Sequence, residues 1–237
     1  MTDIVRREVR DRVATLTIDN GKANVLSPDV LAALEAEVDR AEAAGPDEIG
    51  ALVITGRPGM LCGGFDLNVI RESPAAAGAL VTAGGAFCAR LLGSPLPVVI
   101  GCGGHAVAAG ALLMLGADER FGAAGSFRIG LIETQIGMVL PRWAVELAEE
   151  RLSRRHFQLA TVGARMYDPI GARDAGFLDA VVEPDELDAT VAAAAAAWAA
   201  LPSAAYRGQV RMMRAARLER LALAIATDRG RTFDLPG

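Results

Sequence analysis

The 237-residue chain is poor in the residues that build metal centres and disulfide frameworks. It has three cysteines, Cys62, Cys88 and Cys102, at irregular spacing, and two histidines, His105 and His156. A disulfide framework or a zinc cluster needs more ligands at more regular spacing, so the sequence argues against both. So few cysteines suit a reducing compartment, and we expect a cytoplasmic protein without a conventional Cys/His metal site.

Positive charge is also scarce. The formal net charge is −5, and Lys22 is the only lysine in the chain. A general nucleic-acid or membrane-surface binder needs a basic field, so we expect neither nucleic acid nor membrane as a partner. One anionic ligand held by a few local cations and backbone amides remains compatible with this charge. Residues 1–12 are rich in charge and lack the apolar stretch of a signal peptide.

One long uncharged segment, residues 91–117, has the length of a membrane span. Pro95, Pro97 and a cluster of glycines interrupt it, which is not typical of a transmembrane helix. We interpret the segment as a buried strand that ends at Gly101, a glycine turn, and a helix over about 106–116.

The pattern of the whole chain predicts an α/β fold with a helical C-terminal section. Hydrophobic residues make up 52% of the chain and charged residues 22%, which is ample for a sizeable core. Expected strands lie at 12–19, 51–55, 98–101, 119–123 and 179–182, and expected helices at 28–44, 75–92, 106–116 and over most of the chain beyond 141. We divide the chain into a core, residues 1–183, and a section, residues 184–237, that packs on this core or on another subunit.

Two glycine-rich turns, at 61–67 and 101–110, are each expected between a strand and a helix. Glycine lets a backbone adopt positive φ and approach a ligand closely, and a helix N-terminus presents unpaired amides. Two such ends that face one carbonyl would form an oxyanion hole. Strand–glycine–helix is common in α/β proteins, so spacing alone favours two ordinary tight turns. Neither turn has the pattern of a phosphate-binding loop or of a nucleophile elbow.

The order of these motifs resembles the crotonase superfamily, also called the enoyl-CoA hydratase/isomerase family. The matching segments are Gly21-Lys22-Ala23-Asn24-Val25-Leu26, Leu52-Val53-Ile54-Thr55-Gly56, residues 61–67, Pro97-Val98-Val99, residues 104–110 with Ala117-Asp118, residues 136–141, and residues 172–181. They span about the first four fifths of the chain. The resemblance implies a crotonase-like spiral of ββα units and an acyl-CoA substrate, with no metal or redox cofactor because CoA belongs to the substrate. It also implies a homo-oligomer, either a trimer or a dimer of trimers.

The resemblance also implies an oxyanion hole formed by the backbone N–H groups of Phe65 and Ala109. Chemistry next to a thioester passes through an enolate-like oxyanion, which two fixed amides stabilise where the charge develops. Substrate contacts are expected from Gly64, Asp66, Leu67, Lys22, Ala23 and Leu112. For Asp66 we prefer a helix cap to a role in proton transfer.

Many hydratases of the family use two catalytic glutamates, and the chain matches only one of these positions. The first position holds Leu112, which cannot exchange a proton, and the second holds Glu133, four residues before Gly137. Moving a double bond from the 3 to the 2 position needs one base, so the residues favour Δ3,Δ2-enoyl-CoA isomerisation with Glu133 as that base. The apolar residues around Glu133 would raise its pKa. Without the family context, Glu133 next to Thr134 would be interpreted as a surface residue.

Two alternatives remain at this stage. The first is a 2-enoyl-CoA hydratase in which Glu133 alone positions water, and the second is an acyl-CoA-binding protein without catalysis. The lysines that the family often places around the first glycine turn are absent, so Lys22, Arg57 and Arg71 are the nearby substitutes for binding the CoA phosphates. Small residues at 75–77 and 84–85 are expected to leave space near the acyl pocket.

Overall fold

The computed structural model describes residues 4–231 and 233 and contains a six-stranded sheet. In spatial order its strands are β1 (Val5–Arg10), β2 (Val13–Ile18), β3 (Ala51–Thr55), β5 (Val98–Cys102), β7 (Glu119–Ala123) and β9 (Ala180–Val182). The β1–β2 pair is antiparallel and the other pairs are parallel. All five strands expected from the sequence agree with these bounds to within one residue at each end.

A second sheet contains three short parallel strands, β4 (Gly59–Cys62), β6 (Gly104–Val107) and β8 (Ile129–Gly130). Along the chain β3 is followed by β4, β5 by β6 and β7 by β8, so each repeat gives one strand to each sheet before its helix. This arrangement confirms the α/β fold with repeated ββα units.

The small sheet corrects one expectation. We expected a helix from about residue 106, but residues 104–107 form β6 and the helix α4 (Ala109–Leu115) begins later. Ala106 pairs with Ile129 of β8, and Gly104 pairs with Gly59 of β4. These partners come from distant parts of the chain, so the local pattern of small apolar residues did not indicate the strand.

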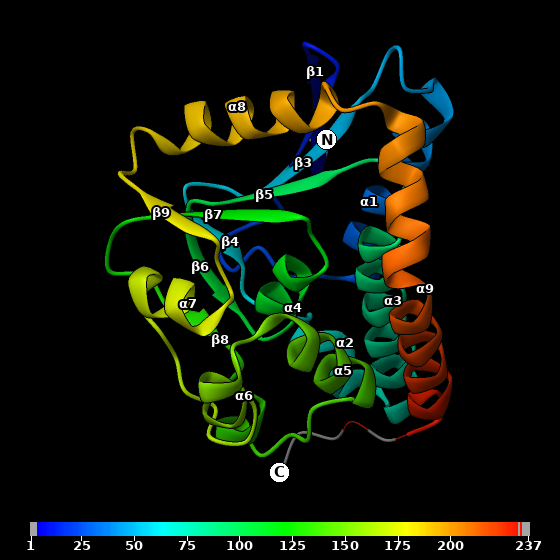
Figure 1. Cartoon of the computed structure of the whole chain (residues 1–237). Coiled ribbons are helices and arrows are strands. Elements are labelled where there is room, and N and C mark those ends of the chain that lie inside the picture. The colour runs from blue at the N-terminus through cyan, green and yellow to red at the C-terminus, as the bar shows by residue number, and fades with distance from the viewer. Residues whose placement is uncertain (1–3, 232, 234–237) are drawn as a thin grey trace.

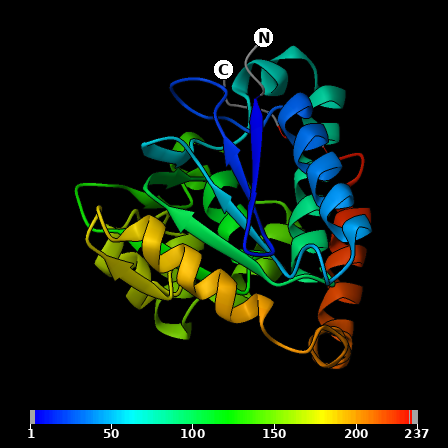
Figure 2. The ribbon, with the colours of Figure 1, turned by 90° about the horizontal axis from the view of Figure 1, so that it is seen from above.

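Most helices lie on the side of the large sheet where the small sheet also lies, as Figures 1 and 2 show. They are α1 (Pro28–Ala44), α2 (Leu67–Glu72), α3 (Pro74–Leu92), α4, the 3₁₀ turn η1 (Glu133–Ile136), α5 (Arg142–Arg151), α6 (Arg154–Thr161), α7 (Pro169–Ala175) and α9 (Ser203–Asp228). The helix α1 begins where the sequence predicts, because the Ser27 side chain accepts a hydrogen bond from the Val30 N–H at 3.2 Å.

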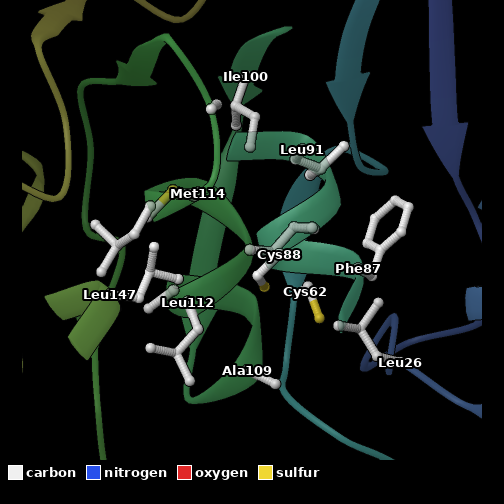
Figure 3. Packing of buried hydrophobic residues seen from close by; sticks show 14 of the residues in the cluster. Leu26, Cys62, Phe87, Cys88, Leu91, Ile100, Ala109, Leu112, Met114 and Leu147 are labelled. Atoms are coloured by element: carbon white, nitrogen blue, oxygen red, sulfur yellow. The ribbon is translucent and has the colours of Figure 1, made fainter. Parts of the chain in front are cut away.

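The helix α8 (Leu187–Ala199) covers the opposite face of the large sheet (Figure 1). Its residues Leu187 and Val191 form a small core with Val53 and Val99 of the sheet. The larger core lies between the two sheets and the remaining helices, and Figure 3 shows part of it. All three cysteines are buried there as free thiols.

The apolar helix α3 is long enough to cross a bilayer, but 56% of its most apolar window is buried inside the fold. It packs against α1, α4 and α9, as a core helix does. The uncharged segment 91–117 is not one helix: it contains the end of α3, then β5, β6 and α4, in agreement with the strand–turn–helix interpretation apart from the added strand.

The C-terminal helices are joined to the core through the buried side chain of Asp118. Its Oδ2 accepts hydrogen bonds from the Val98 N–H at 2.8 Å and from the Tyr206 hydroxyl at 3.1 Å, and its Oδ1 forms an ion pair with Arg214. Arg214 also donates to the Leu92 carbonyl at 2.7 Å. The helix α9 therefore packs on the core of its own chain. The boundary between the sections 1–183 and 184–237 stays a prediction, and residues 1–3, 232 and 234–237 of these sections lie outside the described residues.

We expect Asp118→Ala to lower the free energy of unfolding by about 3–5 kcal/mol, because it removes one partner of a buried ion pair. The change leaves the Arg214 guanidinium and the Val98 N–H without their acceptor. Urea denaturation measures the difference. Asp185→Ala, on the exposed surface, is the control and should stay within about 0.5 kcal/mol of the native protein. A loss for Asp118→Ala no larger than the control's would contradict this role.

Candidate active site

The three strands of the small sheet end at one edge, and each is followed by a turn that reaches the same cavity. After β4 come Gly63, Gly64 and Phe65, after β6 comes Ala108, and after β8 comes Glu133. Carboxyl ends of parallel strands lie at one edge of a sheet, where α/β proteins commonly bind ligands. The cavity has a volume of about 140 Å³ and is partly open to solvent, because the wall residues Leu67 and Val139 are exposed.

The first turn is fixed by backbone contacts with the loop that precedes α1. The Gly63 N–H donates to the Ala23 carbonyl at 2.9 Å, and the Gly64 N–H donates to Cys62 Sγ at 3.4 Å. The amide of Asn24 is buried and donates to the carbonyls of Ile18, at 2.9 Å, and Leu61, at 2.8 Å. Asn24 thus joins the ends of β2 and β4, a role that the sequence did not reveal.

The second turn approaches the first at backbone distance. Gly64 has φ +108°, and a Cβ placed there would lie 3.2 Å from the Cβ of Ala108. A Cβ at Gly110 would lie only 2.2 Å from the Cys62 carbonyl oxygen, so α4 can pack this closely only with glycine at that position. Ala108 has φ 53° and ψ −121°, a strained conformation for a residue with a side chain.

The backbone N–H groups at these turns that have no hydrogen-bond partner within residues 4–231 and 233 include those of Phe65 and Ala109. Leu26 pairs with the neighbours of Phe65: its N–H donates to the Gly64 carbonyl at 2.8 Å, and its carbonyl accepts from the Asp66 N–H at 3.0 Å. The Phe65 N–H is left over. The Ala109 N–H has no acceptor either, because Ala109 is the first residue of α4 and no carbonyl of the helix precedes it. The family resemblance assigns these two N–H groups to an oxyanion hole, and this assignment stays a prediction.

Glu133 is buried, with 8% of its surface exposed. Burial in apolar surroundings raises its pKa from the usual value of 4.5 to about 7. Its Oε2 is enclosed and has no hydrogen-bond partner among the described residues. Of the described residues that line the cavity, Glu133 is the only titratable one. The interpretation of Glu133 as a surface residue is thereby excluded.

The residues after Glu133 hold its turn against α6. The Thr134 hydroxyl donates to the Thr161 carbonyl at 3.3 Å, and the Gln135 amide donates to the Ala164 carbonyl at 2.7 Å. These polar side chains made the segment look like a surface loop in the sequence. Their hydrogen bonds instead anchor the turn while Glu133 lies on the cavity wall.

The remaining expected site residues divide into two groups. Leu67 and Leu112 lie on the cavity wall with Gly64, Phe65 and Glu133. The other described wall residues are Gly63, Ile70, Val81, Ala108, Ile132, Ile136, Met138, Val139, Pro141 and Phe233. Four expected residues do not line the cavity: Lys22, Ala23, Asp66 and Ala109. Asp66 caps α2, because its side chain accepts from the Asn68 N–H at 2.9 Å.

The space expected at Gly84 and Gly85 is filled by aromatic rings of the protein itself. A Cβ at Gly84 would lie 2.4 Å from the ring of Phe65, and one at Gly85 would lie 2.8 Å from the ring of Trp143. These glycines therefore make room for the two rings and not for a ligand.

Neither His105 nor Cys62 has the surroundings of a catalytic group. The Nδ1 atom of His105 accepts from the Arg128 N–H at 3.0 Å, and the ring packs edge-on against Phe127. Burial raises the pKa of the Cys62 thiol to about 12, so this cysteine is protonated at neutral pH and is a poor nucleophile.

Two cations lie beside the loop that contacts the first turn. Arg57 donates to the Lys22 carbonyl at 3.3 Å, and its Nε lies 3.8 Å from an Asp19 oxygen. Lys22 is exposed, and Arg71 is exposed at the end of α2. Three separate segments of the chain thus supply the cations Lys22, Arg57 and Arg71.

The raised pKa of Glu133 predicts how stability depends on pH. Between about pH 4.5 and pH 7 the folded protein keeps a proton that the unfolded chain has released, so stability falls as pH rises through this window. Glu133→Gln lacks this loss. From about pH 4 to about pH 8 we expect its free energy of unfolding to gain about 3 kcal/mol relative to the native protein. Thermal or urea unfolding at several pH values measures the gain.

Glu149→Gln, on the exposed face of α5, is the matched control for this pH series. A constant difference between Glu133→Gln and the native protein at every pH would show that Glu133 is not held protonated by burial.

Comparison with known proteins agrees with this geometry. A family model described as enoyl-CoA hydratase/isomerase matches residues 8–233. The human protein named enoyl-CoA delta isomerase 1, mitochondrial, is 30% identical over 211 residues, which cover 88% of this chain and 70% of the human one.

Solved structures give a similar result. An enoyl-CoA hydratase/isomerase family protein from Pseudomonas syringae is 43% identical with a TM-score of 0.94, and the match covers 98% of this chain and 99% of that one. An enoyl-CoA isomerase from Mycobacterium tuberculosis is 35% identical with a TM-score of 0.90, over 96% of this chain and 98% of that one.

Proposed function

The chain belongs to the enoyl-CoA hydratase/isomerase family, and from this membership we propose that it is a Δ3,Δ2-enoyl-CoA isomerase with Glu133 as its single base. Members of the family are enzymes that act as enoyl-CoA hydratases or isomerases, so the open question is which reaction this chain performs. The observation that carries the proposal is the cavity wall, where Glu133 is the only titratable residue among those described and Leu112 occupies the position of the other glutamate.

The unpaired N–H groups of Phe65 and Ala109 suit the thioester carbonyl of the substrate. Removal of a proton from C2 moves negative charge onto this oxygen, and fixed backbone donors stabilise the charge without reorganising. These donors belong to the main chain, so phenylalanine and alanine supply them as well as other residues do. The carbonyl held in this way places C2 of the acyl group next to the two turns.

Glu133 then moves one proton. Its carboxylate takes the proton from C2, and the C–H electrons form a dienolate whose charge rests on the thioester oxygen. The same carboxyl group returns the proton to C4 while a C2–C3 double bond forms and the carbonyl is restored. No atom is gained or lost, and no cofactor is required. A pKa of about 7 suits both steps, because the carboxylate is a competent base near neutral pH and its acid form still donates.

Leu112 argues against efficient hydration. Addition of water across a conjugated double bond needs one group to activate water and another to deliver a proton, which two carboxylates do well. Leu112 is 2% exposed and presents a hydrocarbon side chain to the cavity. The apolar wall therefore favours a proton shuttle over a positioned water.

The proposal also covers the binding of the CoA phosphates, the oligomeric state and the location of the protein. We assign the CoA phosphates to Lys22 and Arg57, which lie together beside the first turn. A homotrimer or dimer of trimers and a cytoplasmic location complete the proposal, and both rest on the family resemblance and on the sequence alone.

The reaction is tested by incubating the purified protein with a 3-enoyl-CoA and recording conjugation by absorbance. We expect steady conjugation that Glu133→Gln slows by roughly 10²–10⁴-fold in kcat, the usual contribution of a positioned base. Glu149→Gln is the control and should match the native rate.

The same assay with a 2-enoyl-CoA separates the alternatives. Rapid loss of conjugation would identify a hydratase in which water is activated despite Leu112. Tight binding of acyl-CoA without turnover, unaffected by Glu133→Gln, would identify a binding protein without catalysis.

The pH profile is a further prediction. Because the base must be deprotonated, kcat/KM for the 3-enoyl-CoA should rise with pH and reach half of its maximum near pH 7. Initial rates at low substrate concentration, from about pH 5 to about pH 9, give this profile. A midpoint near the ordinary pKa of a glutamate, or a flat profile, would be inconsistent with a buried Glu133 acting as the base.

A further inference from the structure

One residue of the C-terminal section, Phe233, lies on the wall of the cavity. It is 4% exposed and belongs to the main hydrophobic core, although it follows the last helix of the chain. Other wall residues include Ile70 of α2 and Val81 of α3. Phe233 thus belongs both to the main core and to the wall of a candidate active site.

A series of contacts fixes the position of Phe233. The guanidinium of Arg231 lies 5.6 Å from the centre of the Phe233 ring, and its Nη1 donates to Asp228 Oδ1 at 2.8 Å. Asp228 is fully buried, and its Oδ2 accepts from the Trp143 N–H at 3.2 Å. Trp143 stands two residues after Pro141, another wall residue. The end of α9 is therefore tied to the start of α5, and this connection places the ring.

Two segments that reach the cavity wall meet α3 at different points along its length. The ring of Phe65 packs against Gly84 of α3, whereas the Arg231 carbonyl passes 3.5 Å from where a Cβ of Gly78 would be. Gly78 and Gly84 are separated by about 9 Å along the helix axis, from the 1.5 Å rise per residue. The Arg231 carbonyl therefore lies nearer to the beginning of α3, and the Phe65 ring lies farther along the helix.

We propose that Phe233 closes the acyl end of the cavity and restricts the enzyme to short acyl chains. This inference rests on the proposed function, since it takes the cavity to hold the acyl group of an enoyl-CoA. The cavity volume of about 140 Å³ is close to that of an apolar protein cavity that holds benzene, so we take it to have room for about six carbons of an acyl chain. The substrate class is therefore a 3-enoyl-CoA of about this length.

The size of the effect follows from the burial of methylene groups. Each methylene that finds apolar space contributes about fourfold to affinity, and one that finds none contributes nothing or prevents binding. Phe233→Ala removes the ring and opens the far wall, so long chains gain contacts while short chains lose little. Phe233→Leu shortens the wall less and keeps an apolar side chain in the core.

The test compares 3-hexenoyl-CoA with 3-dodecenoyl-CoA. For the native protein we expect kcat/KM to favour the shorter ester by about 10²-fold, and Phe233→Ala to reduce this preference at least about tenfold. Phe233→Leu should lie between the two, and it replaces Phe233→Ala if the latter fails to fold. Phe127→Ala, which removes a ring that packs on His105 outside the cavity, is the matched control and should leave the preference unchanged.

Binding of the saturated esters hexanoyl-CoA and dodecanoyl-CoA, measured by calorimetry, separates this inference from the proposed function. If the native protein binds the shorter ester more tightly and Phe233→Ala reduces this preference, the result supports the role of Phe233 in limiting chain length, even if no isomerisation is found. Equal binding and turnover of both lengths by the native protein, or an unchanged preference in both Phe233 variants, would overturn the proposal while leaving the isomerase proposal intact.

Discussion

The parallel pairing of β4, β6 and β8 is the constraint on which the site depends. Strands in a sheet lie about 4.8 Å apart, so turns that follow neighbouring strands at the same edge begin at about this separation. Two N–H groups this far apart can both donate to one oxygen, because each hydrogen bond spans about 2.9 Å. The small sheet thus brings the turns that contain Phe65 and Ala109 to one edge, and its third strand leads to Glu133.

The close approach of the first two turns strains the backbone at Ala108, and hydrogen bonds of the surrounding structure offset this strain. The left-handed φ of Ala108 costs of order 1–3 kcal/mol, and it persists because hydrogen bonds on both sides leave the chain little choice. Ala108 donates to the Gly130 carbonyl at 2.9 Å, and the Leu112 N–H returns to the Ala108 carbonyl at 3.1 Å. The strained peptide is the one whose N–H belongs to Ala109, so the strain and the unpaired donor have a common origin.

Much of the large sheet and of the long helices could be predicted from local sequence, because their signals are local. Ser27 and Pro28 mark the start of α1, and the apolar run at 51–55 marks β3. The small sheet could not be predicted, since its strands are two to four residues long and find their partners far along the chain. Glu133 was identified only through the family resemblance, because burial of a glutamate beside Thr134 is a tertiary effect. Phe233 gave no local signal at all, since its place on the wall depends on α9 returning to α5.

The unpaired N–H groups are part of the main chain, and this has a consequence for how such a protein changes over generations. Substitution of the Phe65 or Ala109 side chain leaves the polarising N–H in place, provided that the backbone keeps its course. The side chains to which the proposed function assigns proton transfer or its absence, Glu133 and Leu112, stand elsewhere on the wall. Under that proposal, a descendant lineage can keep the main-chain donors and acquire a different reaction through one or two replacements at these positions.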